Sequence, residues 1–516
     1  MNKTTRADID KVLWSAADTF RGTIDASIYK DYILVMLFLK YLSDMHDEHY
    51  EAYMERYDGN EKRVERAMRR ERFLLDEISS FNYLYANRTQ PNIGEIINKA
   101  LGKIEEDNSA KLTGVFRNID FNSESVLGAT KQRNTVLRNL LEDFNKLNLR
   151  PSALGHDDII GDAYQYMIER FASDAGKKGG EFFTPPMVSE LLARLVDPQE
   201  NDRIYDPTCG SGSLLIRAAR KVPDNKVAIY GQERNGQTHS LAKMNMFLNN
   251  IDDAQIEWGD TLSNPLHLDE EGNLMKFQKI VANPPFSLKK WSDGFAGDGE
   301  DKFKMESSLD PHNRFEWGVP PQGRGDMAFI QHMLYSLTED GTMATIIPHG
   351  VLFRGAAEQR IRKAFIDLNY LDAVIGLPES LFYGVGIPTS ILVFKKNRKQ
   401  TNVLFIDASG EDHYESGSNQ NYLREEDVEK IVETYQNYET IDKYSHVASI
   451  DEIKENDYNL NIPRYVDTFE EEEPVDMEEV QENIDNLKME IRDVEMKIKK
   501  YFNELNLKGD NFEKKN

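Results

Sequence analysis

Asn283, Pro284, Pro285 and Phe286 are the four residues whose types and order most directly suggest chemistry. The apolar run before them, residues 279–282, predicts a buried strand that two consecutive prolines must end and stiffen at its exit. The Asn283 side-chain oxygen and the Pro284 carbonyl can accept hydrogen bonds from one exocyclic amino group, while Phe286 offers its face to a ring. An adenine turned out of a DNA helix is such a ring. Taken alone, the motif also fits a proline-stiffened loop with a phenylalanine in the core.

A glycine-rich turn, residues 206–213, follows a predicted strand at 203–205 and opens a predicted helix at 214–221. Glycines at such a junction, here Gly210 and Gly212, let the backbone approach a ligand under the positive end of the helix. An acid at the first position argues against a phosphate ligand. It favours a ligand that carries a cationic amino group.

Three acidic residues follow three successive predicted strands. Asp206 ends the first, Glu233 follows the second, where nucleotide-binding sheets hold a ribose diol, and Asp260 ends the third, placed to accept from an adenine amine. Each of them alone would also fit a helix cap or a solvated loop. Together they predict the edge of a pocket.

Residues 179–186 contain paired glycines and paired aromatics before a helix that we predict from residue 187. Thr184 as N-cap, with Pro185 at the first helical position, explains the local spacing structurally. The hydroxyl and the free helix N–H groups would also receive a carboxylate. A ligand with an amino acid at one end and adenosine at the other is S-adenosyl-L-methionine, so the sequence predicts a methyl donor facing an amino-group acceptor.

Composition limits the class of protein. The 516 residues suffice for about three domains, and the apolar fraction of 40% indicates a globular chain. A single cysteine, Cys209, excludes a disulfide framework, and no Cys/His cluster has metal-ligand spacing. The polar start and the short apolar run at 33–39 predict a protein of the cytoplasm, without signal peptide or membrane span. The net charge of −26 predicts weak unaided binding to DNA, so local basic patches or a partner must supply the attraction.

Hydrophobic periodicity predicts an α/β fold class, a Rossmann-like doubly wound methyltransferase sheet between helical ends. We expect a helical N-terminal domain at 1–150, the catalytic domain at 151–408, a mixed acidic connector at 409–474, a C-terminal helix at 475–506 and a polar tail at 507–516. The strands of a parallel sheet with crossover helices are predicted at 203–205, 227–231, 256–259, 279–282, 341–348, 371–377, 390–395 and 403–407.

The C-terminal helix carries apolar residues at alternating spacings of four and three, which is typical of a coiled-coil seam. An amphipathic helix packed on its own domain is the alternative. A hinge at 469–474, rich in glutamate, favours a partner helix. The seam residues are Val480, Ile484, Leu487, Ile491, Val494, Ile498, Tyr501 and Leu505.

The order of the Thr-Pro, Asp-Pro-x-x-Gly-Ser-Gly and Asn-Pro-Pro-Phe motifs resembles the gamma class of methyltransferases that modify DNA adenine at N6. More specifically, the chain resembles the modification (M) subunit of type I restriction-modification systems. Further support comes from Leu13-Trp14, from the run at 38–42, and from the segments at 376–378, 386–389 and 461–465. The resemblance implies cofactor contacts from Glu181, Phe182, Phe183, Thr184, Pro185, Pro186, Ser211, Gly212, Ser213 and Glu233.

The resemblance also implies the partners. A separate specificity (S) subunit reads the DNA sequence, with two M chains per S chain, and a restriction (R) subunit can join them. The rival functions are methylation of a protein glutamine or of RNA, and a non-catalytic assembly role. His349 is expected to be structural, the segment 323–326 fits a turn as well as a phosphate contact, and Lys289-Lys290 is the basic pair that best suits DNA.

Overall fold

The structure is a computed structural model of the chain. Two compact units, Met1–Asp467 and Thr468–Asn516, are described separately. The hinge at 469–474, Leu505 and the tail at 507–516 lie outside the described residues. Those that the structure describes are 3–21, 24, 26–154, 159–174, 184–296, 304–382, 384–417, 420–468 and 477–504.

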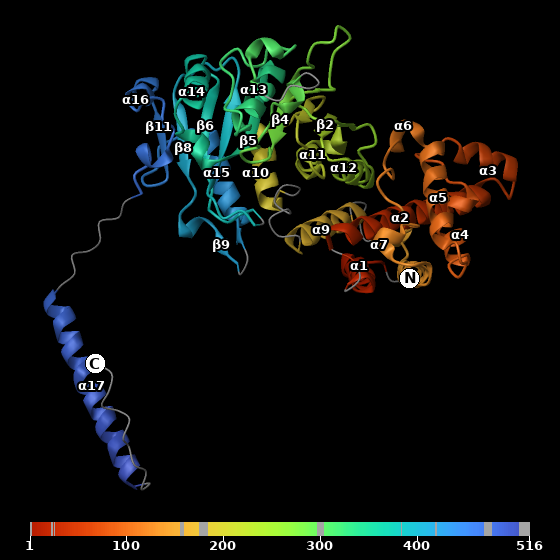
Figure 1. The fold of residues 1–516 in the computed structure, drawn as a ribbon, viewed down its shortest axis with the longest axis horizontal. Coiled ribbons are helices and arrows are strands. Elements are labelled where there is room, and N and C mark those ends of the chain that lie inside the picture. The colour runs from red at the N-terminus through yellow and green to blue at the C-terminus, as the bar shows by residue number, and fades with distance from the viewer. Residues whose placement is uncertain are drawn as a thin grey trace. The chain divides into compact units, whose positions relative to one another are not determined.

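Helices build the N-terminal region, as predicted (Figure 1). The longest, α2, is buried along residues 32–45, so the other helices pack around it. This core also includes apolar residues of the sheet region, namely Leu241, Met244, Phe247 and Leu248. The hydrophobic core therefore continues past residue 150, where we predicted the helical domain to end. The helices are α1 Arg6–Phe20, α2 Ala26–Arg56, α3 Glu61–Met68, α4 Phe81–Ala86, α5 Ile93–Asp107, α6 Ser109–Leu112, α7 Glu124–Leu127, α8 Thr130–Phe144 and α9 Ile159–Asp174.

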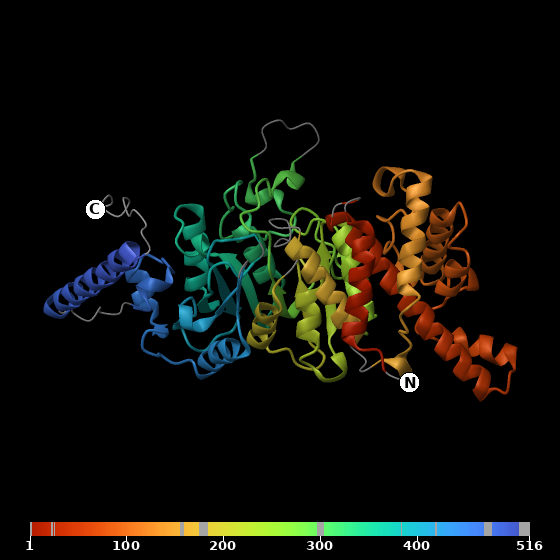
Figure 2. The same ribbon diagram turned by 90° about the horizontal axis from the view of Figure 1, so that it is seen from below.

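A nine-stranded sheet follows, in the order β11-β8-β6-β7-β5-β4-β1-β2-β3. The predicted doubly wound architecture is confirmed, because apolar cores cover both faces of the sheet: α10, α11 and α15 contribute to one, and α13 and α14 to the other (Figures 1 and 2). The strands are β1 Arg203–Asp206, β2 Ala228–Glu233, β3 Gln255–Trp258, β4 Phe277–Ala282, β5 Leu337–Pro348, β6 Leu371–Gly376, β7 Thr389–Lys395, β8 Val403–Asp407 and β11 Ser445–Ala448. The helices are α10 Pro186–Val196, α11 Ser213–Ala219, α12 Gly236–Leu248, α13 Asp326–Ser336, α14 Ala357–Asp367, α15 Glu425–Asn437 and α16 Ile450–Glu455.

The expectation of a parallel sheet is wrong for β7, which runs antiparallel to both β5 and β6. The chain passes from β6 to β7 without a helix among the described residues, and a parallel strand would need a longer crossover.

The sheet also extends past residue 408. The strand β11, which the sequence did not reveal, pairs antiparallel with β8, and Tyr465 stacks on Phe405 with ring centroids 3.9 Å apart. A small hairpin of β9 Glu415–Ser416 and β10 Asn421–Tyr422 lies between these elements in the chain.

The second unit contains α17, Met477–Glu504. Its apolar side chains are exposed, among them Ile484, Leu487, Ile491 and Val494 of the predicted seam. The helix is thus observed, while its pairing into a coiled coil stays a prediction. Within the described part of the chain, no helix combines the length and apolarity that a membrane crossing requires.

Candidate active site

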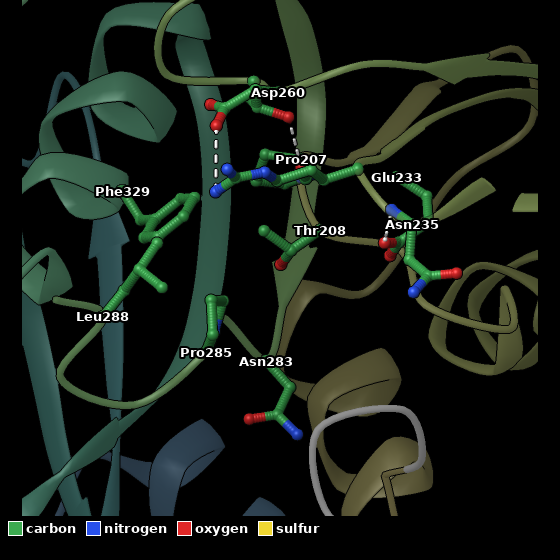
Figure 3. A pocket seen from close by; sticks show the side chains of 11 residues that line it. Pro207, Thr208, Glu233, Asn235, Asp260, Asn283, Pro285, Leu288 and Phe329 are labelled. Carbon is green, nitrogen blue, oxygen red and sulfur yellow. Dashed lines mark hydrogen bonds and ion pairs between the residues drawn. The ribbon is translucent and has the colours of Figure 1, made fainter. Parts of the chain in front are cut away.

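Four neighbouring parallel strands, β4, β1, β2 and β3, end at the same edge of the sheet. Because the sequence places a polar residue after each of them, these residues converge on one cavity of about 380 Å³ (Figure 3). In Figure 3, Pro285 and two apolar residues that the sequence did not reveal, Leu288 and Phe329, form one wall, with Glu233 and Asn235 opposite. The lining residues are Pro207, Thr208, Glu233, Arg234, Asn235, Asp260, Thr261, Asn283, Pro285, Leu288 and Phe329.

Asp206 does not line this cavity but lies fully buried beneath its floor. Its Oδ1 accepts a hydrogen bond from the Thr208 backbone N–H at 2.9 Å, whereas Oδ2 has no partner among the described residues. Burial is the main cause that raises the pKa of Asp206 to about 8, and the nearby Glu233 carboxylate adds to it. An unmatched buried acceptor of this kind favours a ligand or a proton that supplies a donor.

Glu233 holds the glycine-rich turn in place. Its carboxylate accepts hydrogen bonds from the backbone N–H groups of Gly210, at 3.0 Å, and of Asn235, at 2.6 Å. Burial raises the pKa of Glu233. Gly212 adopts φ = 80° just before α11, and a Cβ there would lie 2.6 Å from the Met246 methyl group, so the position needs glycine.

Asp260 is fixed from both sides at the end of β3. Its Oδ1 accepts from the backbone N–H of Leu262, at 2.9 Å, and of Ser263, at 3.2 Å, while Oδ2 pairs with the Arg234 guanidinium at 3.2 Å. The carboxylate therefore faces the cavity in a set orientation, as Figure 3 shows.

Thr184 is not the N-cap that the sequence predicted. Helix α10 begins at Pro186, its N-cap is Pro185, and no side chain caps it, because the Thr184 hydroxyl accepts instead from Asn283 Nδ2 at 3.1 Å. This hydrogen bond joins the Thr-Pro and Asn-Pro-Pro-Phe motifs across the top of the sheet. Glu181, Phe182 and Phe183 lie outside the described residues.

A second cavity, of about 160 Å³, lies on the other side of Thr184. Thr184, Pro186 and Ser213 line it together with residues of α1, α9, α10 and α11. Ser211, from the same glycine-rich turn, is buried, and its hydroxyl has no partner among the described residues. Part of the predicted site thus lines one or the other of two cavities, and the Thr184–Asn283 hydrogen bond joins a residue of each.

The loop after Asn283 is anchored by Asp326, which belongs to the segment 323–326 that fitted both a turn and a phosphate contact. The carboxylate of Asp326 accepts from the Ser287 backbone N–H at 2.8 Å and pairs with Arg354 at 3.3 Å. Phe286 is not among the residues that line the larger cavity, and its ring packs edge-on against Phe382, with centroids 5.8 Å apart. Pro284 is buried, so the loop is held rigidly on both sides of its prolines.

Comparison with known proteins agrees with this geometry. A family model described as N-6 DNA Methylase matches residues 155–474, and one described as HsdM N-terminal domain matches residues 9–144. The type I restriction enzyme MpnII methylase subunit of Mycoplasma pneumoniae is 33% identical, over 98% of this chain and 98% of its own. The chain belongs to the family of type I restriction enzyme methylase subunits.

Other members show the same extent of similarity. The MjaVIII methylase subunit of Methanocaldococcus jannaschii is 32% identical over 98% of this chain and 86% of its own. The crystal structure of the type I restriction-modification methyltransferase subunit of Streptococcus thermophilus superposes with a TM-score of 0.77, at 34% identity, over 90% of this methylase chain and all of the other.

Membership of the N-6 DNA methylase family supports S-adenosyl-L-methionine as the cofactor, as the sequence predicted. The cavity fits such a ligand, because the Glu233 and Asp260 carboxylates that line it can accept from amino and hydroxyl groups. The unmatched Oδ2 of Asp206 also leaves one buried acceptor for a donor.

Sequence reasoning missed the residue that holds the loop after β3. Arg314 is completely buried and donates to Asp310, to the carbonyls of Thr261 and Leu262, and to His332. Burial, and secondarily the charge of Arg314, lowers the pKa of His332 well below its usual range, so the imidazole is neutral. These contacts fix the backbone next to Asp260 from below.

His349 has a structural role, as expected. Its ring nitrogens contact Ser390 Oγ at 3.2 Å and Asn461 Oδ1 at 2.8 Å. It thereby ties the segment at 461–465, one of those that carried the family resemblance, to the ends of β5 and β7.

Proposed function

We propose that this methylase subunit transfers a methyl group from S-adenosyl-L-methionine to N6 of an adenine turned out of double-stranded DNA. The observation that carries the proposal is the hydrogen bond from Asn283 Nδ2 to Thr184 Oγ1 at 3.1 Å. With its NH₂ occupied in this way, the amide directs Oδ1 elsewhere, and that oxygen is the acceptor that an incoming amino group requires.

The chain's own residues would act on the amino group of the base. Asn283 Oδ1 and the Pro284 carbonyl accept its two N–H bonds, which favours a tetrahedral nitrogen whose lone pair is no longer delocalised into the ring. Phe286 holds the base by stacking, worth roughly 1 to 3 kcal/mol. The bound cofactor supplies an electrophilic methyl group on a sulfonium. Catalysis by these residues is positioning and electrostatics, since they supply no strong base.

The cofactor would be held by the residues around the two cavities. Glu233 and Asp260 accept from hydroxyl and amino groups on the β2 and β3 side, while the turn after β1 and the start of α10 lie on the other. We assign to this role Glu181, Phe182, Phe183, Thr184, Pro185, Pro186, Asp206, Gly210, Ser211, Gly212, Ser213, Glu233 and Asp260.

Transfer of a radiolabelled methyl group tests the proposed substrate. The subunit, mixed with its specificity chain, is offered duplex DNA, RNA and protein, and the labelled product is hydrolysed and analysed by mass spectrometry. We expect N6-methyladenine in DNA. Label in RNA, in protein glutamine or at a cytosine would contradict the proposal, and absence of cofactor binding by calorimetry would favour a non-catalytic assembly role.

We further propose that α17 joins this subunit to the specificity chain, two methylase chains to one, that the partner brings most of the DNA contact, and that a restriction subunit can join. The apolar residues of its seam are exposed in the structure, for example Leu487 at 57% and Val494 at 52%. A heptad seam of this kind stabilises a helix by packing against a partner.

Paired substitutions test this assembly. Leu487→Lys/Val494→Lys places two charges on the seam and is expected to weaken the complex at least tenfold by size-exclusion and light scattering. Met489→Lys/Met496→Lys is the matched control, because these residues are equally exposed, at 59% and 62%, but lie off the seam. Equal behaviour of the two variants, or an unchanged complex after deletion of residues 475–516, would contradict the assignment.

A further inference from the structure

The end of α2 and α3 form a hairpin that is remote from the sheet (Figures 1 and 2). A third cavity, which is polar, lies in this hairpin. Asp58 and Gly59 adopt positive φ angles of 52° and 76° and turn the chain between the two helices. The cavity measures about 350 Å³. Its lining residues are Tyr53, Arg56, Tyr57, Arg63, Arg66, Ala67 and Arg70.

Four of these residues are exposed arginines, and none of the seven is acidic. No ion pair to the four guanidinium groups is found within the described part of the chain. The neighbouring cations differ in this respect: Arg69 pairs with Glu65 at 2.8 Å, and Arg72 forms a fork on Asp252. The arginines that line the cavity are therefore the ones left without a carboxylate.

The acidic residue that lies nearest in sequence to the last arginine is already engaged. Glu71 accepts a hydrogen bond from the Tyr53 hydroxyl at 2.6 Å and contacts His49 Nδ1 at 2.9 Å. This contact fixes the Tyr53 ring, which stacks on Tyr57 with an interplanar angle of 16° and centroids 6.0 Å apart. The cavity thus has an aromatic wall held by hydrogen bonds and a basic wall of exposed side chains.

The spacing of the arginines indicates what would neutralise them. Arg63 and Arg66 lie three residues apart on one face of α3, and Arg70 follows two residues after the end of that helix at Met68. Four guanidinium groups around a cavity of about 350 Å³ carry more charge than a single small anion neutralises, and they suit successive phosphates along a strand. Guanidinium groups bind phosphate oxygens in forked pairs, and they keep their charge at any physiological pH.

We propose that this cavity, the Arg-hairpin cavity, binds backbone phosphates of double-stranded DNA away from the catalytic pocket. The proposal rests on the proposed function, because it assumes that DNA is the substrate. The cluster of unpaired arginines would add a local attraction to a chain whose net charge of −26 otherwise repels a polyanion, beside the contacts that the specificity chain brings.

The salt dependence of DNA binding tests the proposal. The probe is a fluorescein-labelled duplex of about 30 base pairs, titrated with the assembled methylase and specificity chains at several salt concentrations, with binding read by anisotropy. Arg63→Gln/Arg66→Gln should weaken binding by roughly tenfold or more at ~0.1 M salt and lower the slope of log Kd against log salt by about two. Arg63→Lys/Arg66→Lys keeps both charges and should retain most of the slope.

The control variant also removes two positive charges, but from residues outside the Arg-hairpin cavity. Lys226→Gln/Lys454→Gln replaces two exposed lysines that are paired with Glu200 and Asp451, and we expect the wild-type slope. Methylation at saturating DNA should also be unchanged in the arginine variant, with only KM for DNA raised. Since anisotropy needs no methyl transfer, a chain that binds DNA through these arginines but methylates something else would contradict the proposed function alone.

Three outcomes would overturn the proposal. One is the same salt slope for the Arg63→Gln/Arg66→Gln variant and its control. Another is a loss of assembly with the specificity chain while the DNA slope of the remaining complex is unchanged, which would assign the cavity to an acidic protein surface. The third is tight, arginine-dependent binding of free ATP with no change in DNA affinity, which would assign it to a nucleotide.

Discussion

The larger cavity at the ends of β1 to β4, here called the strand-end cavity, is lined by carboxylates, whereas the Arg-hairpin cavity is lined by arginines. In the first, short carboxylates leave the ends of strands and are fixed by backbone N–H groups, as Glu233 is by Gly210 and Asn235. In the second, exposed guanidinium side chains come from α2, from α3 and from the turn after α3, and none of them has a carboxylate partner among the described residues. The first arrangement holds each hydrogen-bond acceptor at one position, whereas the second concentrates positive charge without holding any one guanidinium group at a single position.

This difference teaches which kind of ligand each cavity suits. A small ligand that must present one methyl group to one nitrogen needs acceptors set by the sheet, because misplacement by about 1 Å costs roughly 100-fold in rate. A phosphate backbone can be held at many positions, so flexible arginines serve it well. Single substitutions in the first cavity should therefore change the methylation rate strongly. In the second cavity, DNA affinity should depend on how many positive charges are removed.

The largest contrast is expected for two arginine-to-methionine changes. Arg314→Met leaves the buried Asp310 carboxylate without its partner, so the free energy of unfolding should fall by about 3–5 kcal/mol. Arg66→Met removes an exposed side chain of the Arg-hairpin cavity and should change stability by less than about 0.5 kcal/mol. Urea unfolding measures both, and similar costs for the two variants would break the contrast.

A smaller effect is expected from Thr184→Val, which removes the acceptor that orients Asn283. The amide can then rotate and present NH₂ to the base, so kcat for DNA methylation should fall by roughly 10- to 100-fold. Thr184→Ser keeps the hydroxyl and should keep most of the activity. Single-turnover kinetics at saturating DNA and cofactor provides the measurement, and equal rates for the two variants would show that this hydrogen bond does not position the amide.

The smallest expected effect is on the pH dependence of stability, through the Asp206 carboxyl group. Asp206 binds its proton more tightly in the folded chain, with a pKa raised from 3.8 to about 8, so its contribution to stability is full at low pH and is lost as the pH rises across that interval. Asp206→Asn stays neutral throughout. Relative to wild type it should gain several degrees of melting temperature between pH 5 and pH 9, while the exposed Asp253→Asn should not. A constant difference across this range would contradict the raised pKa.

Some of the site could be read from the sequence because strands and turns are local. The strand-end positions of Glu233 and Asp260 follow from hydrophobic runs that end at polar residues, and a parallel order brings such ends together. The antiparallel direction of β7 and the short edge strand β11 carry no comparable local signal. The direction of a strand such as β7 depends on the length of the connection from the strand before it. A strand of four residues such as β11 is too short to show an alternation of apolar and polar residues.

Other parts depend on contacts between residues far apart in the chain. Thr184 looked like an N-cap because caps are common at such spacings, but its partner, Asn283, is 99 residues away. No local pattern marks Arg314, because it donates to the carbonyls of Thr261 and Leu262, which lie 53 and 52 residues away in the chain. Arg63, Arg66 and Arg70 lie in a charged stretch of the sequence, and only the hairpin with α2 brings them around a cavity.

The central claim is that Asn283 acts on the base and not on the cofactor. The direct test is Asn283→Ala, compared with Asn273→Ala at an exposed turn, with the affinity for S-adenosyl-L-methionine measured by calorimetry and methylation of cognate DNA measured with radiolabel. We expect cofactor affinity within about threefold of wild type and a loss of methylation of at least about 100-fold, comparable to removing one transition-state contact. Methylation at the wild-type rate by Asn283→Ala would contradict the account.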